Sequence, residues 1–171
     1  MKLSIKTITY TALLLALTVA AQQFKMVSQL ITGPIINAIL ILATLYIGLA
    51  SGSIIAILSP VFALIINPTA ILLALPVMTP TIIIGNLLLV LCAFYFKKKN
   101  LISGLILGSV LKSGFLWLCV SFIVVPYFGA GLAPKLKTAV QAAFSYNQLI
   151  TALTGSLIAY IIWPRLKNIG Q

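Results

Sequence analysis

Polar side chains that could bind a ligand are few in this chain, and none of them is a carboxylate or an imidazole. The 171 residues include no Asp, no Glu and no His, so the side chains offer no carboxylate or imidazole for proton transfer or metal ligation. The uncharged amides and hydroxyls that remain can donate and accept hydrogen bonds. We therefore expect binding rather than catalysis, with no cofactor and no metal ion.

Eight polar residues are the candidates for one substrate-binding site. Amides among them offer both donors and acceptors, which suits a small heterocycle or an amide. Asn37 and Asn86 lie at similar depths below the same predicted membrane face, which favours a shared cavity. For these two a second interpretation stays open, in which each makes a structural hydrogen bond between helices. The candidates are Gln29, Thr32, Asn37, Asn86, Lys112, Asn147, Gln148 and Thr151.

Lys112 is the exceptional candidate, because it lies near the middle of a predicted membrane helix in a chain without acidic side chains. A lone ammonium at that position costs at least about 2.5–3.5 kcal/mol. Lys112 could face the cavity and meet an anionic group of the ligand. It could instead lose its proton, contact backbone carbonyls, or snorkel to water. Its expected depth, beyond Asn37 and Asn86, argues against direct contact with the ligand.

The composition that surrounds these residues is that of an all-α integral membrane protein. Apolar residues make up 62% of the chain and charged residues 6%, against about 25% charged residues in soluble domains. Continuous apolar runs approach or exceed the roughly 20 residues that cross a bilayer. The net charge of +11 could suggest nucleic acid, but the cations lie at the ends of apolar segments, as topology signals do. We expect no nucleic-acid partner.

Turn and cap residues divide the chain into six predicted transmembrane helices within one domain, 1–171. Gly33 and Pro34 are expected to open the second helix, and Ser51 and Gly52 to form the tight connection that follows it. Pro126 is expected to end the fifth helix. The third helix is unusually short in this prediction. The predicted ranges are 4–23, 33–50, 53–66, 80–96, 101–125 and 145–163.

The positive-inside rule predicts that both termini are cytoplasmic. An inside N-terminus places seven cations on the inner side and three on the outer side. The inner cations are Lys2, Lys6, Lys97, Lys98, Lys99, Arg165 and Lys167, and the outer cations are Lys25, Lys135 and Lys137. The first apolar run also resembles a secretory signal peptide. Removal of this segment would leave five helices. Too few other cations would then lie on the same side of the membrane as Lys97, Lys98 and Lys99 to explain that lysine run.

Two of the outer connections have structure of their own in this prediction. Residues 67–79 are apolar but contain two prolines and are too short to span, which indicates a re-entrant or lid-like segment, or an extension of a neighbouring helix. Leu136, Val140 and Phe144 recur at four-residue spacing among polar residues, which predicts a short amphipathic helix on the outer face.

Small residues at four-residue spacing mark helix faces that another helix can approach closely. Ala12, Ala16 and Ala20 form such a face on the first helix, and it could pack inside the bundle or on a partner. Two similar series are best interpreted as packing inside the bundle. They are Gly104 with Gly108 in the fifth helix, and Thr151 with Gly155 and Ala159 in the sixth.

The chain as a whole resembles the substrate-binding S components of energy-coupling-factor (ECF) transporters, the ABC-type importers of vitamins and related micronutrients. The resemblance rests on six predicted helices in 171 residues, cytoplasmic termini, the alanine face of the first helix and the segment Thr32-Gly33-Pro34-Ile35-Ile36-Asn37-Ala38. It implies an S-component-like bundle in a prokaryotic plasma membrane. Such a bundle is not an enzyme and binds a small-molecule substrate on its outer face.

The resemblance also implies partners and a substrate class. Ala12, Ala16 and Ala20 would dock on the transmembrane T subunit, and two ATPase subunits would supply the energy. Relatives often carry an acid near the outer start of the sixth helix, where this chain has the neutral segment 145–148. A neutral or anionic vitamin or precursor is therefore expected rather than a cation such as thiamine. An autonomous small-solute permease or exporter and a non-transporting assembly subunit remain alternatives.

Overall fold

A computed structural model describes residues 4–26 and 29–169, and all regular secondary structure in them is helical. Six of these helices are long and apolar enough to cross a membrane. The chain is therefore an all-α membrane protein, as the composition predicted. Of the cations counted for topology, Lys2 lies outside the described residues, and the side chains of Lys25 and Lys167 are not described.

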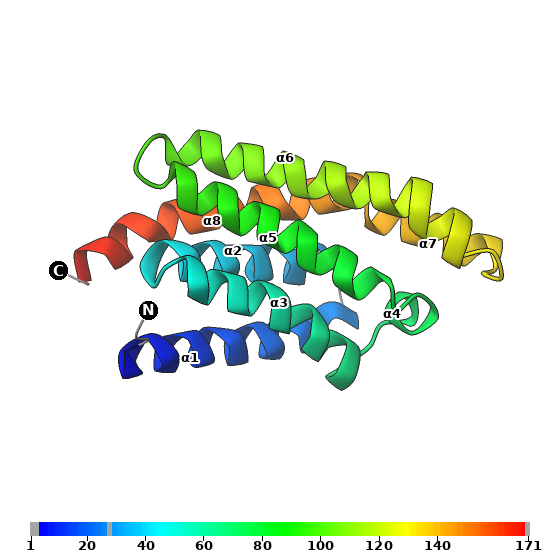
Figure 1. The fold of residues 1–171 in the computed structure, drawn as a ribbon, viewed down its shortest axis with the longest axis horizontal. Helices are drawn as coiled ribbons and strands as arrows, with labels where there is room; N and C mark the ends of the chain where they lie inside the picture. Colours follow the sequence, from blue (N-terminus) through cyan, green and yellow to red (C-terminus); the bar gives the residue numbers. More distant parts are fainter. Residues whose placement is uncertain (1–3, 27–28, 170–171) are drawn as a thin grey trace.

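Six long helices run side by side along the molecule, and two short helices lie at the end away from the chain termini (Figure 1). In chain order the elements are α1 (Ile5–Gln22), the 3₁₀ segment η1 (Gln23–Met26), α2 (Gln29–Tyr46), α3 (Leu49–Ile66), α4 (Ala70–Ala74), α5 (Met78–Phe96), α6 (Leu101–Cys119), the π-helical segment η2 (Val120–Phe128), α7 (Pro134–Ala143) and α8 (Tyr146–Ile169).

Several helix ends differ from the predicted ranges because proline does not end these helices. The second helix begins at Gln29, so Gly33 and Pro34 lie inside it. The fifth span continues through Pro126 as a π-helix, and α8 continues through Pro164. Membrane helices tolerate internal proline because neighbouring helices and local π or 3₁₀ adjustments satisfy the freed backbone groups. The fourth predicted helix likewise starts earlier, at Met78 rather than at 80.

The connection between α2 and α3 lies at Gly48 rather than at Ser51 and Gly52. Gly48 has φ of 138°, a conformation that side chains with a Cβ rarely adopt. Helix α3 begins at the next residue and contains 18 residues, so it is not short. Gly52 lies within α3 and allows close contact with α2, because a Cβ there would lie 2.0 Å from Thr44 Oγ1.

Helix α2 is the central element and packs against α1, α3, α5 and α8. Its contact with α8 depends on two glycines. A Cβ added to Gly33 would lie 2.8 Å from the Thr151 Cβ, and one added to Gly155 would lie 2.6 Å from the backbone oxygen of Pro34. The prediction that Gly155 serves packing inside the bundle is confirmed. The same holds for Gly104 and Gly108 of α6, which face α5.

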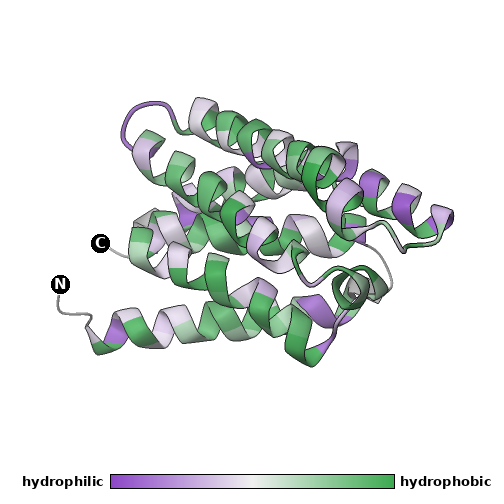
Figure 2. Cartoon of the chain, turned by 45° about the vertical axis from the view of Figure 1, so that its right-hand side comes forward, coloured by the Kyte–Doolittle hydropathy of each residue, from purple (hydrophilic) through white to green (hydrophobic). Residues whose placement is uncertain are grey.

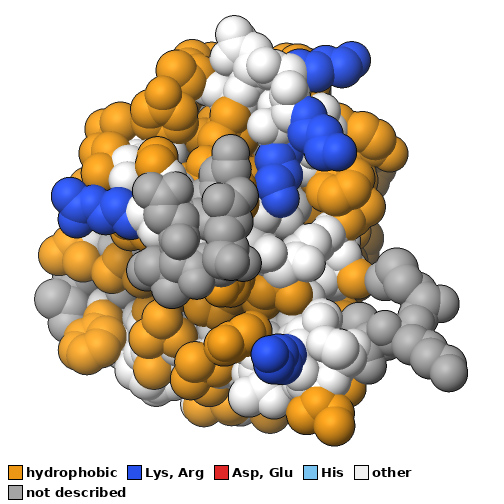
Figure 3. Space-filling model, turned by 90° about the vertical axis from the view of Figure 1, so that its left-hand side faces the viewer, with side chains coloured by type: hydrophobic (Ala, Val, Ile, Leu, Met, Phe, Trp, Pro, Cys, Tyr) orange, Lys and Arg blue, Asp and Glu red, His pale blue; other side chains and the backbone are white. Residues whose placement is uncertain are grey.

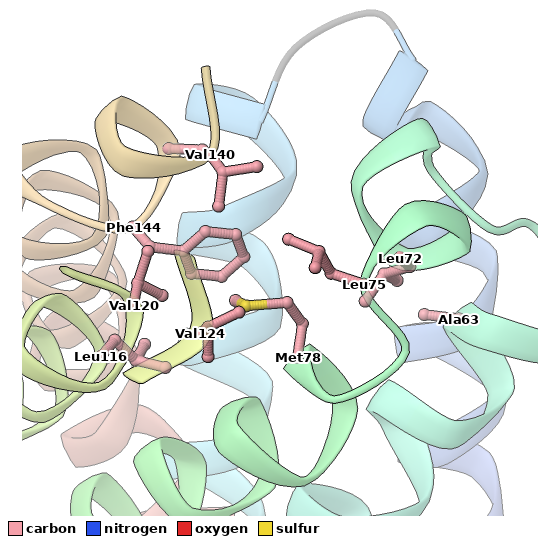
Figure 4. Packing of buried hydrophobic residues seen from close by; sticks show 10 residues of the cluster. Ala63, Leu72, Leu75, Met78, Leu116, Val120, Val124, Val140 and Phe144 are labelled. Atoms are coloured by element: carbon pink, nitrogen blue, oxygen red, sulfur yellow. The ribbon is translucent and has the colours of Figure 1, made fainter. Parts of the chain in front are cut away.

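An apolar cluster closes the end of the bundle that carries α4 and α7 (Figure 4). Phe144 and Val140 point towards Leu75, and Met78 lies between the two sides. Residues 67–79 therefore fold over this end as a turn of helix that joins α3 to α5. Helix α7 is amphipathic, as predicted, with Val140 in the cluster. The buried members are Ala63, Leu72, Leu75, Met78, Leu116, Val120, Val124, Val140, Ala143 and Phe144.

The opposite end of the bundle carries most of the described cations. Helix α1 begins there, α8 ends there, and the α5–α6 connection with Lys97, Lys98 and Lys99 lies beside them. Figure 2 shows hydrophilic residues in this connection and on α7, with apolar helices between them. Figure 3 views this end and shows several Lys and Arg side chains on its surface. The positive-inside rule predicts that it faces the cytoplasm.

Candidate functional site

A cavity of about 150 Å³ lies in the half of the bundle away from the chain termini. Residues of α1, α2, α3, α5, α6 and α8 form its walls, and α4 together with Phe144 borders it at the end of the bundle. Helix α2 contributes more of the lining than the other helices, in keeping with its central position. This is the region in which the sequence predicted a shared polar site.

Seven of the eight predicted site residues line this one cavity. Gln29 and Thr32 reach it from the start of α2, not from a loop as expected. The other five are Asn37, Asn86, Lys112, Gln148 and Thr151. The eighth residue, Asn147, does not line the cavity. It precedes Gln148 on α8, and neighbouring residues of a helix point about 100° apart around its axis.

The Lys112 ammonium lines the cavity and is bound by two asparagines from other helices. Lys112 Nζ donates to Asn37 Oδ1 at 2.5 Å and to Asn86 Oδ1 at 2.7 Å. All three side chains are buried, with exposed fractions of 4%, 2% and 3% for Lys112, Asn37 and Asn86. The expected greater depth of Lys112 is therefore wrong, and so is the water-exposed interpretation.

The lysine fixes the orientation of both amides. An ammonium can only donate hydrogen bonds, so each asparagine turns its oxygen, and not its NH₂ group, towards Lys112. Asn86 Nδ2 donates to the backbone oxygen of Ala56 at 3.4 Å. For Asn37 Nδ2 the described residues offer no acceptor. The two asparagines thus make structural hydrogen bonds between helices and also line the cavity.

A further amide, Gln22, lines the cavity from the end of α1, although it was not among the predicted site residues. Its Nε2 donates to the backbone oxygen of Ser59 at 3.0 Å and to the Ser59 hydroxyl at 2.9 Å. Gln22 lies on one side of α1 with the buried residues Thr11 and Thr18, and Thr11 bonds Ser51 of α3 at 2.8 Å. This helical spacing of polar residues is the signal that would have identified the buried face of α1.

The alanine face of α1 points away from the bundle. Ala12, Ala16 and Ala20 are all exposed, whereas Thr11 and Thr18 are buried against the other helices. The interpretation that these alanines pack inside the bundle is therefore wrong. They leave an open, small-residue face along a membrane-spanning helix, which is the geometry that favours close approach of another helix in lipid.

Much of the remaining wall of the cavity is apolar. Ile36 of α2, Ile82 of α5 and Leu72 of α4 line it together with Phe144. A positively charged floor below apolar walls can hold a small molecule with a polar end and an apolar body. The lining residues include no acid, imidazole or thiol.

Comparison with known proteins identifies one family. A family model described as "ECF transporter, substrate-specific component" matches residues 6–166, nearly the whole chain. Neither the comparison with curated proteins nor the comparison with solved structures gave a significant match.

Proposed function

Because the chain belongs to the substrate-specific components of ECF transporters, we propose that its cavity captures a small neutral or anionic micronutrient for ATP-driven uptake. Members of this family are multi-pass plasma-membrane subunits that bind substrate and are not enzymes. They work with the T and ATPase subunits of the transporter. Beyond these family properties, we propose where the substrate binds, what charge it carries and which surface of the chain meets the T subunit.

The observation that carries the proposal is the polar floor formed by Lys112, Asn37 and Asn86. Buried polar groups in an apolar bundle are costly unless they are hydrogen-bonded, and a buried charge is costly unless it is also paired. Here they line a cavity that has room beside them. The positive-inside rule directs the end with α4 and α7 outward, so a ligand would enter from the outer face. The seven lining residues that the sequence predicted are the proposed substrate-binding residues.

The exposed alanines of α1 are the proposed docking face for the T subunit. Van der Waals contact between closely spaced helices drives association in lipid, and alanine allows this close approach. The binding subunit itself needs no energy source in this arrangement, because two ATPase subunits hydrolyse ATP elsewhere in the complex. The loaded subunit would tip in the membrane against the T subunit and release its ligand inside.

Two measurements test the proposal. Mass spectrometry of the wild-type chain after gentle purification should identify a retained small molecule, and the chain should co-purify with T and ATPase subunits when they are expressed together. Uptake of that molecule in vesicles should require all the subunits and ATP. Uptake by the chain alone would favour an autonomous permease. Failure both to retain a ligand and to bind the other subunits would favour an assembly subunit.

A further inference from the structure

The charge and size of the cavity restrict its ligand further than the family does. We infer that the ligand is a monocarboxylate with one ring or a short apolar body, whose carboxylate meets Lys112 and Asn37 Nδ2. This inference rests on the proposed function, because it concerns the same cavity. The charge balance, the hydrogen-bond donors and the volume of the site support it.

The charge balance requires an anion. Lys112 is 4% exposed, and the sequence contains no acidic side chain that could neutralise its ammonium. Its Nζ donates hydrogen bonds to the oxygens of the two asparagines, at 2.5 and 2.7 Å. Amide dipoles solvate this charge without cancelling it. A ligand that brings a negative charge removes the imbalance, whereas a cation would increase it.

The donors available suit a carboxylate. The amide orientation set by Lys112 leaves Asn37 Nδ2 without an acceptor among the described residues, beside the ammonium that Asn37 Oδ1 contacts. Two neighbouring donors match the two oxygens of one carboxylate. A phosphate monoester has three acceptor oxygens and about −1.5 to −2 charges at neutral pH, more than one buried lysine would balance. The site therefore favours a singly charged carboxylate over a phosphate.

The volume limits the rest of the molecule. A cavity of about 150 Å³ is the size of an engineered apolar cavity that holds benzene, whereas drug-sized ligands occupy about 300–1,000 Å³. Fused two-ring and three-ring molecules exceed this space. The walls beyond the polar floor are largely apolar, including Ile36, Ile82 and Phe144. One ring or a short branched chain with a carboxylate at one end fills such a site.

Matched acid and amide probes test this inference. Binding to the purified full chain would be measured by calorimetry for benzoate and benzamide, for cyclohexanecarboxylate and its amide, for 2-naphthoate and for phenyl phosphate. We expect at least one single-ring acid to bind at least tenfold more tightly than its amide and than the two-ring acid and the phosphate. Absence of binding by both single-ring acids, or equal binding of acid and amide, would overturn the inference.

The variant Asn86→Asp isolates the charge effect. It places a carboxylate beside Lys112 with almost no change of shape and leaves Asn37 Nδ2 available. The acid should lose at least tenfold in affinity, and its amide should be little affected. Asn147→Asp makes the same chemical change outside the cavity and should bind the acid as wild type does. If Asn86→Asp does not fold, Lys112→Met removes the cation instead and should give the same loss. Unchanged acid affinity in the folded variant contradicts the inference.

The identity of the retained molecule separates this inference from the proposed function. A retained and transported molecule that is neutral or built on two or more rings would overturn the inference and leave the proposed function standing. A single-ring monocarboxylate would support both. Loss of partner co-purification, with acid binding intact, would instead contradict the proposed function alone.

Discussion

Asn37 on α2 accepts a hydrogen bond from Lys112 on α6 at 2.5 Å, across 75 positions of sequence. The same ammonium bonds Asn86 on α5, so three helices meet at one polar point inside an apolar bundle. The groups that hold these helices in register are also the groups that face the cavity. Substitutions here should therefore affect both stability and ligand affinity, and the two effects need separate controls.

Asn37→Ala should weaken binding of the molecule that the wild type retains by about 5-fold to 150-fold, corresponding to 1–3 kcal/mol for an unpaired buried polar group. The melting temperature should also fall, because Lys112 loses one of its acceptors. Calorimetry and thermal unfolding in detergent measure the two effects. Asn147→Ala is the matched control, since Asn147 lies outside the cavity, and it should change neither quantity. Wild-type affinity in a folded Asn37→Ala variant would remove Asn37 from the site.

Ala16→Leu should leave folding and ligand binding intact but abolish ATP-dependent uptake. Ala16 is exposed on α1, so the larger side chain meets nothing within the bundle but keeps a partner helix at a distance. Uptake into vesicles and co-purification with the T subunit measure the effect. Gly114→Leu on α6 adds a similar bulk where a Cβ meets no atom within 4 Å, and it should transport normally. Normal assembly of Ala16→Leu would place the docking face elsewhere.

Gly155→Ala should destabilise the fold by about 1–3 kcal/mol through overpacking. The added Cβ would lie 2.6 Å from both the Pro34 backbone oxygen and the Asn37 Cβ, and the backbone of α2 cannot move aside as a flexible side chain could. Ligand affinity should fall as well, because the shift reaches Asn37. Thermal unfolding checks the result against Gly114→Ala, which meets open space and should be neutral or stabilising. A wild-type melting temperature would show that α2 and α8 separate easily.

Lys97→Met should lower stability by about 1–2 kcal/mol, because Lys97 joins three helix ends at the cationic end of the bundle. Its Nζ donates to the backbone oxygen of Leu45 near the end of α2 and lies 4.9 Å from the centre of the Trp163 ring on α8. Lys99→Met removes the same charge from an exposed side chain and should change stability by less than about 0.5 kcal/mol. Equal melting temperatures for the two variants would mean that Lys97 acts only through its charge.

The membrane class, the six spans and the polar residues of the cavity could be predicted from the sequence. These are local properties: a run of apolar residues long enough to cross a bilayer must be a helix, because no water satisfies its backbone groups there. The depth of Asn37 and Asn86 followed from counting residues along such helices. The helix ends were less predictable, since Pro34, Pro126 and Pro164 lie inside helices whose neighbours stabilise them.

Only the tertiary structure decided how the side chains are rotated about each helix and which ones meet. Counting along α6 placed Lys112 too deep, because the count ignores the four-carbon stem that carries its ammonium to Asn37 and Asn86. For the same reason, counting residues included Asn147 among the candidates, although it does not line the cavity. It also could not decide whether the alanine face of α1 packs inside the bundle or on a partner. In a chain that is apolar on nearly every helix face, hydrophobic periodicity does not distinguish lipid from protein. The packing of the whole bundle decides whether a given helix face meets lipid or another helix.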